Sequence, residues 1–270
     1  MSANFIAHTK KDPNGSPLPP QTLEDHLDGV ANKAEKFATE FNSAAWGSAL
    51  GVAHDVGKCR EEWQKYILAK NEEDHSEEGL GRVQHSIHGA KLCEDLYGKG
   101  IGRILSYCIA GHHTGLPDWS PAEGQGKAAL SYRLSQIKDL SDIDILFQEK
   151  VKQTKPSQLP WRFNRGLDVS LWIRMLFSCL VDADYLDTEA YMDPEKSKQR
   201  SGYCSISELL ERLRKHNQQL DETAEDTPVN QIRREIRQKC IDAAQGPQGI
   251  FSLSVPTGGG KTLSSLAFAL

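Results

Sequence analysis

The stretch SAAWGSALGVAHDVGK (residues 43–58) decides the fold class that we expect for this chain. Its first eleven positions combine small residues with scattered large apolar ones, a pattern typical of a helix that is buried on all sides. We expect this helix to end at Gly57. His54 and Asp55 stand just before that end, so an imidazole and a carboxylate occupy neighbouring positions. The stretch therefore predicts a helical domain built around a buried polar site.

Apolar residues recur at helical spacing through most of the first 220 positions, and no alternating strand pattern interrupts them. The predicted helices are residues 23–41, 86–97, 102–113 and 169–186, with Gly98 and Gly100 between the second and the third. Two polar segments, 69–84 and 114–128, are rich in loop-forming residues. The second follows His112 and His113 directly and is expected to border a site. The first 220 residues should be nearly all α-helical.

Further histidines and an aspartate lie on separate predicted helices. The candidate metal ligands are His26, His54, Asp55, His85, His112, His113 and Asp182. A lone histidine on an apolar helix is usually a hydrogen-bonded core residue, but here each candidate lies at the end or on the inner face of a different helix. Imidazole and carboxylate together suit first-row transition metals. We therefore expect a site for two divalent ions, with iron, manganese, cobalt or nickel favoured over magnesium.

Asp55 is the natural bridge of such a site, because its two carboxylate oxygens can face different ions. His54 would serve one ion, and the pair His112 and His113 the other. Lys58 lies one helical turn beyond His54, so its ammonium group could neutralise phosphate charge in catalysis. The remaining histidines, His8, His75, His88 and His216, have no comparable setting and are expected to be structural or exposed.

The composition is that of a globular protein without a membrane span. No apolar run reaches about 20 residues, and the N-terminus lacks the apolar core of a signal peptide. The six cysteines show no CxxC spacing, which favours reduced thiols in a cytoplasmic protein over a disulfide framework or a zinc ribbon. The net charge of −5 does not indicate nucleic-acid binding, but much of the acid is local, so a basic groove elsewhere is compatible with it.

The pattern changes after residues 221–228. Residues 230–244 predict an amphipathic helix, 249–255 (GIFSLSV) a buried strand, 256–262 (PTGGGKT) a glycine-rich turn, and 263–270 a helix. Strand, glycine loop and helix in that order predict the start of an α/β domain. In such a loop the phosphate-binding residues are Gly258, Gly260, Lys261 and Thr262. Val255 stands where a strict Walker A motif has glycine.

Four motifs in order carry a resemblance to a known family: AHDVGK (53–58), HSIHGA (85–90), AGHHTG (110–115) and LVDADYLDTE (180–189). The order of histidines and aspartates resembles the HD superfamily of metal-dependent phosphohydrolases. More narrowly, the motifs resemble the nuclease domain of the type I CRISPR-associated helicase–nuclease. PTGGGKT resembles motif I of superfamily 2 helicases. The resemblance implies an HD-type helical nuclease domain over 1–225 and the first part of a RecA-like helicase domain over 226–270.

The resemblance also implies how the ligands divide. His26, His54, Asp55 and Asp182 would hold one metal, and Asp55 with His85, His112 and His113 the second. The first histidine of HSxxG is the ligand, which favours His85 over His88, and Asp184 is expected near the site or at the helix end instead of on a metal. ATP and Mg²⁺ would bind only with the full helicase, so we expect no ATP turnover from residues 1–270.

The function implied is cleavage of single-stranded DNA in CRISPR antiviral defence, with an RNA-guided surveillance complex as partner. Trp119 or Trp161 could stack on bases near the entrance, and acidic surface segments could attract a protein inhibitor. Two alternatives stay open at the level of sequence. An HD-type nucleotide phosphohydrolase would share the metal chemistry, and a non-catalytic module could recruit the helicase to its RNA-guided complex.

Overall fold

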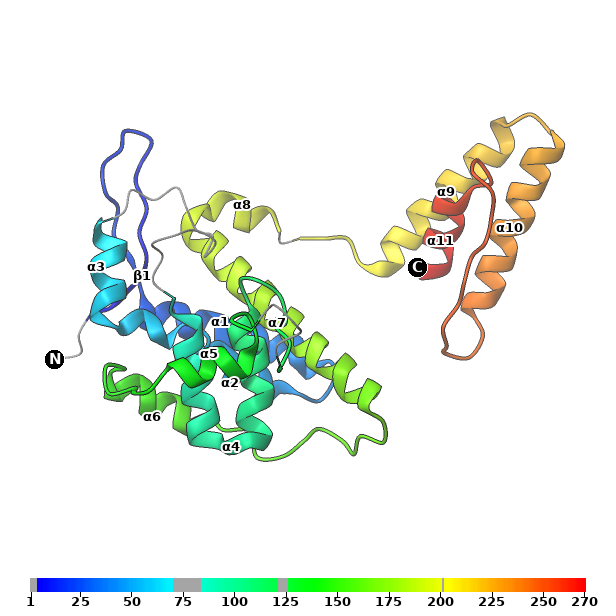
Figure 1. Ribbon diagram of the computed structural model, residues 1–270. Helices are drawn as coiled ribbons and strands as arrows, with labels where there is room; N and C mark the ends of the chain where they lie inside the picture. The colour runs from blue at the N-terminus through cyan, green and yellow to red at the C-terminus, as the bar shows by residue number, and fades with distance from the viewer. Residues whose placement is uncertain (1–3, 70–83, 121–125, 201) are drawn as a thin grey trace. The chain divides into compact units, whose positions relative to one another are not determined.

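The computed structural model describes residues 4–69, 84–120, 126–200 and 202–270, and the chain divides into two compact units. The first unit comprises Met1–Lys198 and the second Gln199–Leu270 (Figure 1). Over the described residues the protein is mainly α-helical, with eleven α-helices and one two-stranded hairpin. The prediction of a mainly α fold is therefore confirmed. Helix α9 groups with the second unit, although the change in sequence pattern lies beyond it.

The elements of the first unit are β1 (Ile6–His8), β2 (Gln21–Thr22), α1 (Leu23–Thr39), α2 (Ala44–Ala53), the 3-10 helix η1 (Val56–Cys59), α3 (Glu61–Ala69), α4 (Ser86–Gly111), α5 (Leu130–Gln136), α6 (Ile145–Gln153), α7 (Gly166–Met192) and α8 (Pro194–Gln199). The second unit contains α9 (Ile206–Thr223), α10 (Pro228–Ala244) and α11 (Lys261–Ala269). The loop predicted at 69–84 falls almost entirely outside the described residues, and the described parts of 114–128 contain no helix or strand.

Helices α1 and α2 approach each other closely because α2 carries glycine at the contact. A Cβ atom on Gly47 would lie 2.3 Å from the Ala34 carbonyl oxygen, and one on Gly51 would lie 2.3 Å from the Ala31 Cα. Neither contact is sterically possible, so larger residues would force the helices apart. Trp46 of α2 meets Trp172 of α7 edge to face at 4.8 Å. Helix α2 is thus the buried centre of this unit.

Helix α4 is two helices joined at Gly98, as the two glycines predicted. Gly98 has a φ of +80°, a conformation that favours glycine. The two halves lie side by side (Figure 1). The Ser106 hydroxyl donates a hydrogen bond of 2.6 Å to the Ala90 carbonyl, and a Cβ on Gly102 would lie 2.3 Å from the Cys93 carbonyl oxygen. The turn brings the N-terminal end of α4 back beside its C-terminal end.

One local prediction for the first unit needs correction, and one element of this unit was not expected. Helix α2 ends at Ala53, not at Gly57, because Asp55 leaves the helical region with φ −118° and ψ 15°, and η1 follows. The antiparallel pairing of β1 with β2 was not predicted either. Strands of three and two residues are too short to show an alternating pattern.

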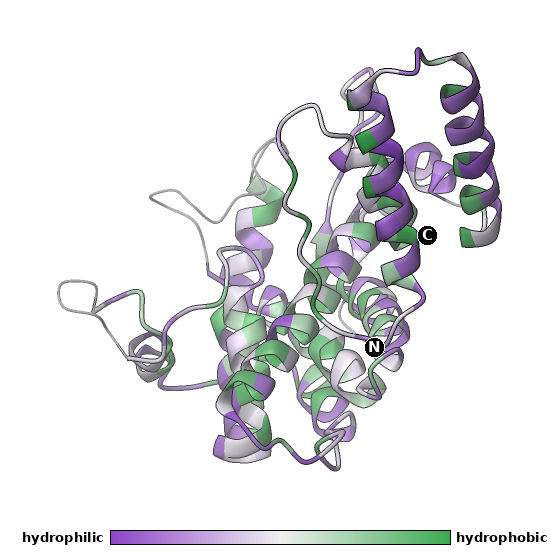
Figure 2. Ribbon diagram, turned by 90° about the vertical axis from the view of Figure 1, so that its right-hand side faces the viewer, coloured by the Kyte–Doolittle hydropathy of each residue, from purple (hydrophilic) through white to green (hydrophobic). Residues whose placement is uncertain are grey.

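In the second unit the helices are confirmed but the strand is wrong. Residues 249–255 form no strand and are almost all exposed. An isolated apolar segment cannot form a strand without a neighbour to pair with, and the described part of this unit contains helices only. No RecA-like lobe is evident among the residues that the structure describes. Helices α9 and α10 are mostly hydrophilic (Figure 2), and α9 begins at a capping box of Ser205 and Glu208.

Within the described parts of the chain, no helix has the length and apolar character needed to cross a bilayer. All six cysteines are free thiols. Cys59, Cys93, Cys108 and Cys179 are buried, and burial raises the pKa of the Cys59 thiol to about 11. These four side chains behave as small apolar core residues.

Candidate metal centre

Three helices and the turn after α2 place histidine and aspartate side chains around one buried point of the first unit. His26 comes from the first turn of α1, and His54 and Asp55 follow α2. The remaining ligand candidates come from the two ends of α4 and from α7. All the candidates together form two clusters that share Asp55. The first contains His26, His54, Asp55 and Asp184, and the second contains Asp55, His85, His112 and His113.

Asp55 joins the clusters by turning one carboxylate oxygen to each. Its Oδ2 atom lies 3.5 Å from the Nε2 atoms of both His26 and His54. Its Oδ1 atom lies 3.0 Å from His85 Nε2 and 3.4 Å from His112 Nε2. Asp55 is 1 % exposed, so the protein alone determines this orientation. The carboxylate expected to bridge two ions stands in the position that bridging requires.

Three of the histidines are oriented by hydrogen bonds from their far ring nitrogen. His54 Nδ1 donates to the Gly51 carbonyl at 2.8 Å, and His112 Nδ1 donates to the Ile109 carbonyl at 2.7 Å. His26 Nδ1 donates to Asp187 Oδ2 at 2.9 Å. Each bond directs the Nε2 atom of its ring toward the centre. Metal-binding histidines characteristically have such a partner on the second nitrogen.

The atoms at the centre fit metal ions better than they fit one another. The Nε2 atoms of His26, His54 and His112 are buried and have no hydrogen-bond partner. Carboxylate oxygens lie 3.3–3.7 Å from them, which is too long for a good hydrogen bond. Two ligands about 2.1 Å from one ion lie roughly 3.0–3.4 Å apart at octahedral or tetrahedral angles. The two clusters could therefore hold metal ions.

The charges of the cluster are strongly coupled. Burial alone would raise the pKa of Asp55, but the nearby charges of Lys58, His54 and His85 hold it well below its usual range. Burial likewise opposes the charge of His26, but the nearby carboxylates of Asp184, Asp187 and Asp55 raise its pKa to about 10. Carboxylates that stay ionised when buried create the negative field that attracts a cation.

The structure places Asp184, not Asp182, in the candidate metal cluster, which corrects the expected position. Asp184 Oδ1 lies 3.3 Å from His26 Nε2 and 3.7 Å from His54 Nε2, whereas Asp182 is exposed. Positions two apart on a helix point to nearly opposite sides. Asp184 lies four residues after the buried Leu180, on the face of α7 that packs inward. That spacing is a signal in the sequence which could have identified it.

Asp187 is a further buried residue that the sequence did not identify. It accepts hydrogen bonds from His26 Nδ1 at 2.9 Å, from Gln21 Nε2 at 2.8 Å and from Lys33 Nζ at 2.6 Å. Gly29 makes room for it, because a Cβ there would lie 2.1 Å from Asp187 Oδ1. Three donors and one glycine thus fix a carboxylate that orients a candidate ligand.

Lys58 is buried in direct contact with the centre. Its ammonium group lies 2.7 Å from Asp55 Oδ2 and 5.4 Å from the ring centre of Trp63. His8 Nε2 is 3.3 Å from the same ammonium group. His8, expected to be structural or exposed, is therefore buried against the site, and burial and the charge of Lys58 lower its pKa. Its place on β1 explains why helical spacing gave no sign of it.

His113 lies at the exposed edge of the second cluster. Its Nε2 atom is 3.1 Å from His85 Nε2. The other members of this cluster are buried. Solvent therefore reaches the second cluster at His113.

The two tryptophans expected to stack on bases both pack against other side chains. The Arg103 guanidinium lies over Trp119, 3.8 Å from the centre of the tryptophan ring. Trp161 packs on Phe163.

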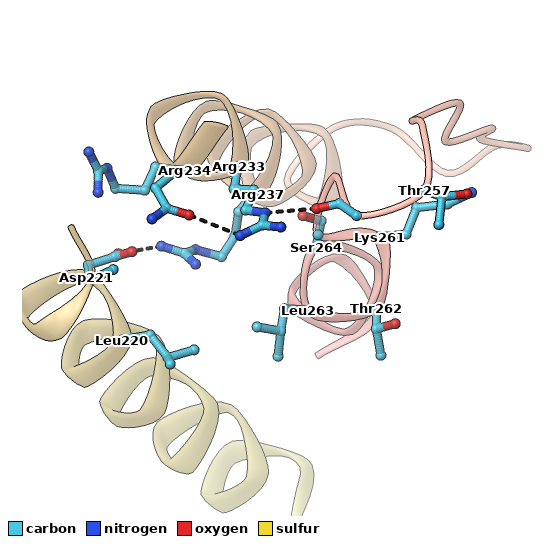
Figure 3. A pocket seen from close by; sticks show the side chains of 14 residues that line it. Leu220, Asp221, Arg233, Arg234, Arg237, Thr257, Lys261, Thr262, Leu263 and Ser264 are labelled. Atoms are coloured by element: carbon cyan, nitrogen blue, oxygen red, sulfur yellow. Dashed lines mark hydrogen bonds and ion pairs between the residues drawn. The ribbon is translucent and has the colours of Figure 1, made fainter. Parts of the chain in front are cut away.

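The second unit brings together the residues predicted to bind phosphate. Gly258, Gly260, Lys261 and Thr262 all line one pocket of about 700 Å³, together with arginines from α10. Gly258 and Gly260 have φ of +86° and +82°. Arg233 Nε donates to the Gly258 carbonyl at 2.8 Å, and Arg237 pairs with Asp221 (Figure 3). The predicted glycine loop and helix start are present, and the described part of this unit places no strand beside them.

No protein-family model matches this chain, and no curated protein matches it either.

Proposed function

We propose that the protein is a metal-dependent nuclease that cleaves single-stranded DNA. One observation carries the proposal: the two buried oxygens of Asp55 face two separate clusters of histidines. A carboxylate in this position suits a pair of divalent ions, and the mixed nitrogen and oxygen donors favour manganese, iron, cobalt or nickel over magnesium. Such a pair, when bound, supplies Lewis acidity and charge stabilisation for phosphodiester hydrolysis.

The residues of the two clusters and Lys58 would have different roles in this reaction. Asp55, with His26, His54 and Asp184, would hold one ion, and with His85, His112 and His113 the other. Lys58 lies against Asp55, where its ammonium group is close enough to offset the charge of a phosphate. His113 stands at the exposed edge, where the reacting phosphodiester would enter.

The substrate is inferred from the motifs. The order of ligands resembles the nuclease domain of the type I CRISPR-associated helicase–nuclease, and the PTGGGKT loop resembles a helicase motif. A helicase would deliver single strands, and a recessed centre admits a flexible strand more easily than a rigid duplex. On this proposal the chain belongs to the DNA-degrading arm of a CRISPR defence system in the cytoplasm, with an RNA-guided complex as its partner.

The test is cleavage of circular single-stranded DNA with Mn²⁺, Co²⁺, Ni²⁺ or Fe²⁺, and with EDTA as the metal-free reference. Asp55→Asn preserves the size of the side chain while removing the bridging charge, so activity should fall by more than about 1000-fold. Asp182→Asn is the matched control, because Asp182 is exposed on α7. Equal cleavage by wild type and Asp55→Asn would refute the nuclease. Hydrolysis of free nucleotides in place of DNA would identify a nucleotide phosphohydrolase, and no hydrolysis at all a docking module.

A further inference from the structure

A groove of about 550 Å³ runs along the first unit beside the exposed edge of the metal centre. Its walls come from the start of α4, from the segment after α4 and from α5. Two of its lining residues are chain neighbours of candidate ligands: Gln84 precedes His85, and Thr114 follows His113. Neighbouring Cα atoms are about 3.8 Å apart, so the groove begins within one residue of the second cluster.

Among the residues that the structure describes, the charged side chains lining the groove are both positive. They are Lys127 and Arg133. Arg133 Nη1 donates to the Ala110 carbonyl at 3.1 Å, which anchors this side chain to the end of α4 near His112. The protein as a whole has a net charge of −5, so a lining of this sign is a local feature. It complements a chain of phosphates.

An exposed aromatic ring completes the groove. Tyr132 of α5 lines it and is 39 % exposed. Aromatic rings beside a cationic track are the recurring device for holding unpaired bases without reading their sequence. The volume lies within the range of about 300–1000 Å³ that is usual for ligand sites. Tyr132 therefore suits the stacking role better than Trp119, whose ring is covered by Arg103.

We infer that this groove holds the single strand of DNA that flanks the phosphodiester at the metal centre. The inference rests on the proposed function, whose substrate it positions. Lys127 and Arg133 would contact phosphates, Tyr132 would stack on a base, and the path from Thr114 to His113 would lead the strand to the reacting position.

Binding without metal tests the groove separately from the chemistry. The affinity of the full chain for a fluorescent dT oligonucleotide is measured by anisotropy in EDTA over a series of salt concentrations. Lys127→Glu should raise the Kd about tenfold and reduce the salt slope by about one. Tyr132→Ala should also raise the Kd about tenfold, and Tyr132→Phe should not. Lys138→Glu makes the same charge change at an exposed lysine outside the groove and should bind as wild type does.

The possible outcomes test the groove and the nuclease separately. Unchanged affinity in Lys127→Glu and Tyr132→Ala, or the same loss in Lys138→Glu, would overturn the groove. Tighter binding of the matching uridine oligonucleotide than of the dT oligonucleotide would overturn the assignment to DNA. Hydrolysis of bis(p-nitrophenyl) phosphate by the wild type is measured in parallel, because this small ester needs no groove. Its absence with every metal would overturn the nuclease, whatever the binding experiment shows.

Discussion

The conspicuous sequence motif of the first unit is buried, whereas that of the second unit is exposed. In the first, His26, His54 and Asp55 are at most 1 % exposed and are surrounded by packed helices. In the second, the glycine loop and the preceding apolar segment lie in the open, with Ile250 fully exposed and Phe251 49 % exposed. Both motifs are clear in the sequence. They differ in whether the same unit also contains the helices or strands that must pack around the motif.

The difference shows what a motif needs to become a site. Ligand atoms are held in place only when their supports are rigid, and in the first unit the supports are helices packed through Gly47, Gly51 and Trp172. In the second unit a φ of +82° at Gly260 and the start of α11 are local features that the loop forms alone. A strand is not local, since its hydrogen bonds must come from another strand.

The sharpest test of the first unit compares two aspartates on one helix. Asp184→Asn should weaken metal binding and reduce hydrolysis by more than about 100-fold, because it removes a charge 3.3 Å from His26 Nε2. Asp182→Asn changes an exposed side chain and should match the wild type. Metal content by mass spectrometry and the cleavage rate check both variants. The reverse ranking would restore Asp182 as the ligand.

Replacing Asp187 tests whether the hydrogen bond that orients the His26 ring contributes to metal affinity. Asp187→Asn should weaken metal affinity by roughly 10–100-fold, because His26 would lose the carboxylate that orients its ring. Titration calorimetry with Mn²⁺ measures the affinity, and circular dichroism checks the fold. An affinity equal to that of the wild type would show that the rigid position of α1 is sufficient without this contact.

Glycine substitutions compare the packing of the two units directly. Gly51→Ala should lower the free energy of unfolding by about 1–3 kcal/mol, since the new Cβ would lie 2.3 Å from the Ala31 Cα. Gly249→Ala, in the second unit, meets only the Phe251 ring edge at 3.9 Å and should change stability little. Urea unfolding measures both. Equal effects would mean that α1 and α2 can separate without cost.

The smallest expected effect is a dependence of stability on pH from His88. Burial and the charge of Arg60 lower its pKa from 6.5 to about 4. Below pH 6.5, His88 therefore binds a proton in the unfolded chain but not in the folded chain. The free energy of unfolding falls as the pH drops from 6.5 toward 4. His88→Gln should flatten this slope, and His216→Gln, at an exposed position of the second unit, should not. Melting temperatures at pH 4.5–7 measure it.

Sequence patterns predicted local features well and their surroundings poorly. The spacing of apolar residues gave α1, α4, α7 and α10, and two glycines gave the break in α4. Asp182 was expected in place of Asp184 because α7 is apolar on most sides, so its apolar pattern did not distinguish the two aspartates near its end. His8 and Asp187 depend on contacts between distant segments, Asp187 with His26 over 161 residues, and no local pattern records those. The strand at 249–255 failed for the same reason.

The bend at Gly98 assembles part of the candidate centre from a short stretch of sequence. His85 and His113 are only 28 residues apart and meet when one helical hairpin closes. The cluster around His26 must wait for α7, far along the chain. Contacts between near neighbours in sequence form early because closing a short loop costs little entropy. We therefore expect the contact between His85 and His113 to form earlier in folding than the cluster around His26.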